Sequence, residues 1–163
     1  MANSASLVAF ITVALFLSLA PTPIRSDEVH DLLPTYGLPA GLLPDAVKSH
    51  SLSDDGTFEV QLTSNCYVHF PTNLVYFSST IKGKLSYGQI SDLSGIQAKK
   101  LFVWVTVTGI VAHPDQNNVE FQVGFLSESL PASEFQSIPP CKSSVSCRGA
   151  SAILSQANLV SES

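Results

Sequence analysis

From residue 57 onward, apolar and polar side chains alternate along this chain with a period of two. The run 57–62 (TFEVQL) places Phe58, Val60 and Leu62 on one side and polar side chains on the other. Successive side chains of a β-strand point to opposite faces, so this alternation is typical of an antiparallel strand with one buried and one solvated face. The sequence therefore predicts a mainly β protein.

Further strand-like segments follow, separated by turn-forming residues at regular spacing. Strands are expected over 66–70, 74–79, 80–87, 99–113 and 119–125. Five or six short strands with little helix favour a small antiparallel β-barrel, closed or nearly closed around an apolar interior. Glycines between these segments are expected in turns, namely Gly83, Gly88 and Gly95. The expected bulky lining of the interior is Phe58, Val60, Leu62, Phe70, Tyr76, Phe121 and Phe125.

The longest expected strand, 99–113, is apolar on both faces at one end. Its odd positions, from Leu101 and Val103 to Val111, predict the core face. Its even positions begin with Phe102 and Trp104, so the outer face is apolar there as well. Either the amino-terminal helices or a partner must cover these two aromatic side chains.

One or two short helices are expected before the strands. Asp27 can cap a helix over 28–33 that Pro34 ends, and a second helix is expected over 45–50, just after Pro44. The segment between them is rich in proline and glycine, which indicates turns.

The first residues predict export from the cell. The apolar run 7–20 is too short for a membrane span, which needs roughly 20 residues, and has the length of a signal-peptide core. Cleavage after Ala20 or after Ser26 fits the small residues there, and an uncleaved anchor is the alternative. We expect three segments: a signal peptide over 1–26, a barrel domain over 27–142 and a serine-rich tail over 143–163.

Charge excludes a large class of partners. The chain carries 8 Lys and Arg against 13 Asp and Glu, a formal net charge of −5, and its bases are scattered. An acidic chain without a basic stripe is poorly suited to bind nucleic acid or anionic lipid surfaces. We expect no nucleic-acid partner and no stable membrane insertion once the signal is removed.

Three cysteines, Cys66, Cys141 and Cys147, follow the expected signal peptide. In an oxidising compartment an odd number implies one disulfide and one remaining thiol, or an intermolecular link. A Cys66–Cys141 disulfide would stabilise the fold by roughly 4 to 5 kcal/mol through chain entropy, against about 2 for a Cys141–Cys147 ring. Both pairings are open at this point.

Catalytic and metal-binding patterns are missing from the sequence. It contains no Gly-x-Ser-x-Gly elbow, no glycine-rich phosphate loop and no Cys-x-x-Cys or His-x-x-x-His spacing. His69 is the one histidine in the interior of an expected strand, and we interpret it as a polar residue on the solvated face. The adjacent Asp54 and Asp55 read as a solvated turn. We expect no cofactor and no metal, and lean away from an enzyme.

Several spaced motifs resemble those of the plant domain-of-unknown-function 538 family. Together they cover about residues 31–141. They are Leu38-Pro39-x-Gly41-Leu42-Leu43-Pro44, then Gly56-x-Phe58-x-Val60-x-Leu62 with Cys66, then Ile81-x-Gly83-x-Leu85-x-x-Gly88-x-Ile90-x-x-Leu93-x-Gly95-Ile96, with Lys99, Trp104 and Phe121-x-Val123-Gly124.

This resemblance implies a small β-barrel from a plant, with a signal peptide in many members and therefore a place in the apoplast or cell wall. The family is described as similar to the lipid-binding barrel of bactericidal permeability-increasing proteins. A hydrolase activity on chlorophyll has also been proposed for it. Secreted members carry cysteine at the positions of Cys66 and Cys141, which implies the longer disulfide.

The leading hypothesis is a secreted, non-enzymatic module that binds a lipid-like or other apolar ligand. Its interior either packs solid or leaves room for that ligand. The alternative, an ester hydrolase, rests on the resemblance alone. The residues expected to contact an apolar ligand are Tyr76, Phe102, Trp104 and Phe121.

Overall fold

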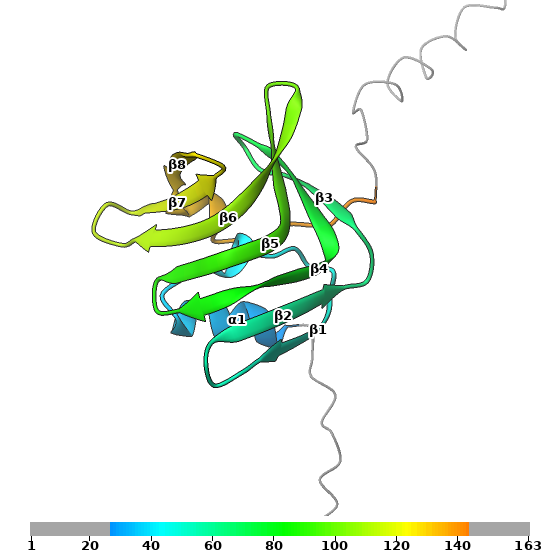
Figure 1. The fold of residues 1–163 in the computed structure, drawn as a ribbon, viewed down its shortest axis with the longest axis vertical. Coiled ribbons are helices and arrows are strands. Elements are labelled where there is room, and N and C mark those ends of the chain that lie inside the picture. The colour runs from blue at the N-terminus through cyan, green and yellow to red at the C-terminus, as the bar shows by residue number, and fades with distance from the viewer. Residues whose placement is uncertain (1–26, 144–163) are drawn as a thin grey trace, which may run out of the picture.

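The chain forms one curled antiparallel sheet of eight strands with short helical segments against it (Figure 1). A computed structural model describes residues 27–143. The expected signal peptide, Cys147 and nearly all of the expected tail lie outside them. The strands are β1 Val47–Leu52, β2 Thr57–Leu62, β3 Cys66–His69, β4 Leu74–Ser86, β5 Gln89–Lys100, β6 Val103–His113, β7 Asn118–Val123 and β8 Leu126–Pro131. The helical segments are α1 Glu28–Thr35 and the 3-10 turns η1 Ala40–Leu42 and η2 Ala132–Phe135.

The sheet is open. Its order is β1-β2-β4-β5-β6-β7-β8, with β3 paired to β4 beyond the end of β2. The mainly β, antiparallel fold with a short helix at the start is confirmed, but the edge strands β1 and β8 do not pair with each other. The concave face is filled instead by side chains from the helical segments, which keep the edges apart. These include Val29, Leu33, Leu42 and Phe135.

Helix α1 presents Val29 and Leu33 to the core. Asp27 stands at its N-cap but its side chain makes no capping hydrogen bond. Pro34 lies inside the last turn rather than after it. The helix ends where Gly37 adopts φ +72°, and the N–H groups of Gly37 and Leu38 donate to Pro34 and Leu33 carbonyls. This is a Schellman ending, which favours glycine at the left-handed position.

The helix expected over 45–50 is wrong, because these residues lead into strand β1. β1 pairs with β2 in a hairpin whose register joins Leu52 to Phe58 and His50 to Val60. The turn between them contains Asp54, Asp55 and Gly56, as the sequence predicts. Residues 47–52 (VKSHSL) have no apolar stripe of helical period, so pairing with a strongly alternating neighbour decides their conformation.

Strands β4 and β5 form one long hairpin, and Gly83 and Gly95 lie inside it rather than in turns. Only Gly88 occupies the turn. β5 is missing from the expected strands because bulges break its period of two: Asp92 and Gly95 both have positive φ, and the register against β4 shifts twice. Its buried side chains are therefore spaced irregularly, at Ile90, Leu93, Ile96 and Ala98.

The core face predicted for 99–113 holds only in its middle, where Val107 and Gly109 are buried. The register against β7 shifts between Val107 and Gly109, so inward-facing positions become even-numbered and Ile110 is buried. Leu101 and Val103 are exposed because they lie beyond the ends of the neighbouring strands. Phe125 is also fully exposed, since Gly124 with φ +62° turns the chain out of β7.

The interior is packed. Two apolar cavities of about 30 and 40 Å³ remain between the sheet and the helical segments. Cavities of this size hold a water molecule or two, whereas pockets for drug-sized ligands measure roughly 300 to 1,000 Å³. The expected lining is partly wrong: Phe58 and Phe121 pack against the core, while Tyr76 lies on the outer face with Tyr67 and Trp104.

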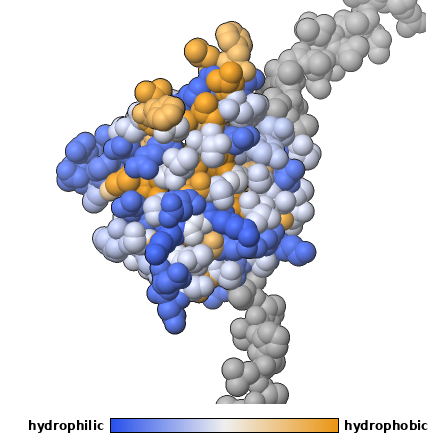
Figure 2. All heavy atoms as spheres, in the orientation of Figure 1, coloured by the Kyte–Doolittle hydropathy of each residue, from blue (hydrophilic) through white to orange (hydrophobic). Residues whose placement is uncertain are grey.

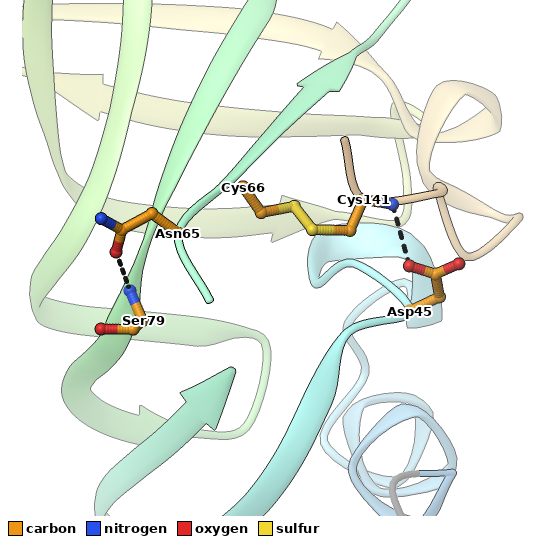
Figure 3. The surroundings of a disulfide bond; sticks show 5 residues. All are labelled: Asp45, Asn65, Cys66, Ser79 and Cys141. Carbon is orange, nitrogen blue, oxygen red and sulfur yellow. Dashed lines mark hydrogen bonds between the residues drawn. A yellow bond between two sulfur atoms is a disulfide. The ribbon is translucent and has the colours of Figure 1, made fainter. Parts of the chain in front are cut away.

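A disulfide between Cys66 and Cys141 fastens the end of the described chain to β3 (Figure 3). The two Cα atoms are 5.4 Å apart and Cys66 is completely buried. The backbone of Lys142 pairs with Tyr67, and the N–H of Cys141 donates to Oδ1 of Asp45 at 2.8 Å. The carboxy-terminal segment is thus held at three adjacent points. This disulfide is the longer of the two pairings open from the sequence.

Replacing Gly95 by alanine is expected to destabilise the fold by more than about 3 kcal/mol. A Cβ there would lie 2.3 Å from the carbonyl oxygen of Thr80, in addition to the strain of a positive φ. Gly88→Ala is the matched control, because Gly88 has a similar φ of +72° and an open surrounding, and should cost about 1 to 2 kcal/mol. Urea midpoints measure both. Equal costs would contradict the close packing at Gly95.

Removal of the disulfide in the variant Cys66→Ala/Cys141→Ala is expected to lower the free energy of unfolding by about 4 kcal/mol. The closed loop spans a sequence separation of 75, and its closure restricts the unfolded chain. Chemical unfolding of oxidised wild type and of the variant measures the difference. A change below about 1 kcal/mol would show that the carboxy-terminal segment contributes little to the fold.

Candidate functional site

Two hairpin turns lie at the same end of the sheet. β5 and β6 pair up to Lys100 opposite Val103, and β6 pairs with β7 up to Val107 opposite Val123. β6 and β7 are antiparallel, so the end at which β6 begins is the end at which β7 finishes. The β5–β6 and β7–β8 turns therefore both lie at this end. The β5–β6 hairpin extends past the end of β7 and projects from the body of the sheet (Figure 1).

Both turns carry exposed apolar side chains. Phe102 is 94% exposed and Leu101 90%, while Phe125 is fully exposed. Figure 2 shows two groups of hydrophobic atoms at this end of the molecule. The helices do not cover Phe102, contrary to one alternative from the sequence, because they pack on the concave face. We call this group of residues the apolar tips; it comprises Leu101, Phe102, Val103, Phe125 and Leu126.

Three aromatic rings lie behind the apolar tips on the outer face of the sheet. Tyr67 of β3, Tyr76 of β4 and Trp104 of β6 have ring centroids 5.2 to 6.2 Å apart, in tilted or edge-on arrangements. Trp104 remains 38% exposed, and Nζ of Lys99 lies 6.0 Å from its ring. We call Tyr67, Tyr76 and Trp104 the aromatic cluster. It contains two of the four residues predicted to contact a ligand, Tyr76 and Trp104. A third, Phe102, lies two residues before Trp104 in the same hairpin.

Phe121, the fourth predicted contact, lies apart from these residues. It packs on the concave side with its ring centroid 5.1 Å from that of Phe135, and it lines the 40 Å³ cavity. The structure therefore separates the predicted ligand contacts into an outer group of three and one interior residue.

Lys100, the last residue of β5, connects the β3–β4 turn to strand β8 at this end. Its Nζ donates to Oδ1 of Asn73 in the β3–β4 turn at 2.7 Å and forms an ion pair with Glu128 of β8. Asn73 and Glu128 also line the 40 Å³ cavity. Lys100 thus holds the base of the β5–β6 hairpin to β8 and provides polar groups over one end of the apolar interior. Its side chain is 31% exposed, so the ion pair is only partly solvated.

The other residues considered from the sequence do not converge on a catalytic arrangement. His113 pairs with Glu120 at 3.1 Å, and Nδ1 of His30 lies 3.0 Å from the carbonyl oxygen of Ala40. His69 is exposed on β3. Within residues 27–143, no hydrogen bond joins a serine hydroxyl to a histidine, and no group of three His, Cys, Asp or Glu residues could hold a metal ion.

Within residues 27–143, two carboxyl groups have shifted pKa values: Asp55, which is exposed, and Glu59, which is partly exposed on β2. Hydrogen bonds from the backbone N–H and hydroxyl of Thr57 lower the pKa of Asp55 and fasten the β1–β2 turn. Hydrogen bonding to the ammonium of Lys82, 2.9 Å away, lowers the pKa of Glu59. Both interactions stabilise local structure and lie on strands β1, β2 and β4 rather than at the apolar tips.

Sequence reasoning missed Lys100, Glu128, Tyr67 and Leu126 as parts of this end. One signal was present: residues 99–104 (KKLFVW) set two lysines before four consecutive apolar residues. Such a run does not alternate, so it departs from the pattern of a strand with one core face and one solvated face. The contacts of Lys100 bring together positions far apart in the chain, and no local pattern shows them.

Comparison with known proteins gives a family and one relative. The family described as "Protein of unknown function, DUF538" matches residues 29–136. The chain is 31% identical over 109 residues to "Uncharacterized protein At5g01610" of Arabidopsis thaliana. That match covers 65% of this chain and 62% of the relative, so the chain spans less than two thirds of the relative's length. No helix among residues 27–143 is long and apolar enough to cross a membrane.

Replacing Lys100 by methionine is expected to lower stability by about 1 to 2 kcal/mol and to loosen β8. The variant loses a charged hydrogen bond and a partly buried ion pair, and leaves Glu128 without its partner. Lys82→Met is the matched control: it removes the more exposed pair with Glu59 and should cost less than about 0.5 kcal/mol.

Urea unfolding measures both changes, and amide hydrogen exchange reports the protection of residues 126–131. Unchanged exchange there in Lys100→Met would contradict the role of Lys100 in holding β8 to the β5–β6 hairpin.

Proposed function

The chain belongs to the plant DUF538 family, and we propose that it is a secreted, non-enzymatic module that binds a lipid-like or other apolar ligand on the outside of its sheet. The observation that carries this proposal is the exposure of the apolar tips beside the aromatic cluster. Monomeric soluble proteins rarely expose several large apolar side chains close together, and such groups mark binding surfaces.

Packing of the interior supports an outer site over an inner one. The cavities of about 30 and 40 Å³ hold no more than water molecules, so an acyl chain would have to displace core side chains. On the outer face, an acyl chain would contact aromatic rings that are already clustered and partly exposed. Aromatic rings offer a large apolar area with few rotatable bonds, which reduces the entropy lost on binding.

Location in the apoplast or cell wall is part of the proposal. The buried Cys66–Cys141 disulfide supports it, because structural disulfides form and persist in oxidising compartments. The apolar run at 7–20 supports it independently, since its length suits a signal peptide.

A fluorescent lipid analogue below its micelle concentration tests the proposal. Micromolar binding to the mature protein is expected, and Trp104→Ala should weaken it by about tenfold, since burial of a large aromatic side chain contributes 1.5 kcal/mol or more. Phe121→Leu is the matched interior variant and should leave the affinity within about twofold.

Two results would contradict the proposal. The first is no binding of the analogue by wild-type protein at micromolar concentration. The second is the reverse order of effects, with affinity lost in Phe121→Leu and kept in Trp104→Ala, which would place the ligand inside the sheet.

A further inference from the structure

We propose that the β5–β6 and β7–β8 turns dock this protein, reversibly and at two points, onto the surface of an uncharged lipid bilayer. This inference rests on the proposed function and names its ligand as assembled lipid rather than single lipid molecules. The argument uses the shape, the order of side chains and the charge of the end that bears the apolar tips.

The shape of this end suits a fluid surface. Phe102 and Phe125 lie in the β5–β6 and β7–β8 turns rather than in a groove, and each is almost or completely exposed. Separate projecting side chains need a partner that can close around them. Lipid does so without a preformed complementary surface, and the apolar area that leaves water provides the driving force.

The order of side chains along the hairpin matches the order of layers in a bilayer. Leu101 and Phe102 come first, and Trp104 follows two residues later along β6, about 7 Å further from the end. Tyr76 is paired to Gln97 and lies further along the same face. Tryptophan and tyrosine gather at the level of the headgroups, where the ring is apolar and its polar atom reaches water.

The charges at this end favour uncharged lipid. Lys100 is already paired with Glu128, and Nζ of Lys99 lies 6.0 Å from the centre of the Trp104 ring. The chain as a whole has a net charge of −5, which an anionic surface would repel. A zwitterionic headgroup such as phosphatidylcholine adds no such repulsion. Apolar burial rather than Coulomb attraction therefore drives the contact.

The fixed base of the two turns makes them act together. The ion pair joins Lys100, next to the β5–β6 turn, to Glu128, two residues after Leu126 of the β7–β8 turn. Two apolar points held by one scaffold bind more tightly than either alone, because the second contact is intramolecular once the first has formed.

Trp104 is the single tryptophan of the chain, so its fluorescence reports this contact directly. With vesicles of phosphatidylcholine, the emission of the mature protein is expected to shift to the blue. Lipids brominated near the headgroup should quench it more than lipids brominated near the end of the acyl chain.

Phe102→Ser and Phe125→Ser are each expected to reduce the vesicle partition coefficient by about tenfold, and the double variant by about a hundredfold. Tyr87→Ser is the matched control. Tyr87 is 81% exposed in the β4–β5 turn, at the opposite end of the sheet, and its loss should change partitioning by less than twofold. All three positions changed are exposed, and circular dichroism checks that the variants fold.

Distinct outcomes separate this inference from the proposed function. Binding of the soluble lipid analogue without a Trp104 shift on vesicles would overturn the docking proposal and leave the proposed function standing. A partition coefficient that rises tenfold or more when a third of the lipid is anionic, and falls again with salt, would also overturn it. So would equal losses in Tyr87→Ser and Phe102→Ser. Failure of both the analogue and the vesicles to bind would reject both proposals.

Discussion

The concave face of the sheet is filled by the chain itself, and this constraint determines much of the rest of the structure. Val29 and Leu33 from one end of the described chain and Phe135 from the other enter the same core as Ile81 and the neighbouring strands. A sheet filled in this way neither needs to close on itself nor leaves room inside. The open edges and the small cavities accompany helical segments that fill the core against the sheet, and the disulfide fastens the carboxy-terminal segment to β3.

A packed interior directs attention to the outer surface. The β5–β6 hairpin is longer than the strand beside it, so its last residues have no neighbour to cover them. An exposed turn that only connects two strands is usually polar, whereas this hairpin bears the exposed apolar residues Leu101, Phe102 and Val103 at its end. Lys100 and Glu128 hold its base in place. The rigid base and the apolar end together suit a binding element better than a connection between strands.

The sequence predicts those parts of the fold that alternation of apolar and polar residues and turn-forming residues determine. The alternation at 57–62 and the turn at Asp54–Gly56 are both present in the structure, and so is a helix near residue 28. β5 was missed because Asp92 and Gly95 form bulges that destroy its period of two. The sequence predicts a helix over 45–50, because residues 47–52 alone carry little strand signal, whereas pairing with β2 makes them strand β1.

The candidate site could be predicted only in part for a similar reason. Phe102 and Trp104 are predicted on an outer face from their even positions in 99–113, whereas Tyr76 is expected in the interior. The structure places Tyr76 beside Trp104 on the outer face instead. Phe121 is expected in the interior, and it does face inward against Phe135. The face of each residue depends on the bulges in β6 and on the packing of η2, and neither is visible in a pattern of apolar and polar residues.

The central claim is that the ligand binds the outer end of the sheet and not its interior. The most direct test is an amide chemical-shift titration of the labelled mature protein with small phosphatidylcholine bicelles. The account predicts shifts concentrated at residues 99–104 and 124–128. The amides of Phe77, Ile96 and Val107, whose side chains face inward, should be nearly unchanged. Large shifts spread over those inward-facing residues, with the two turns unaffected, would contradict it.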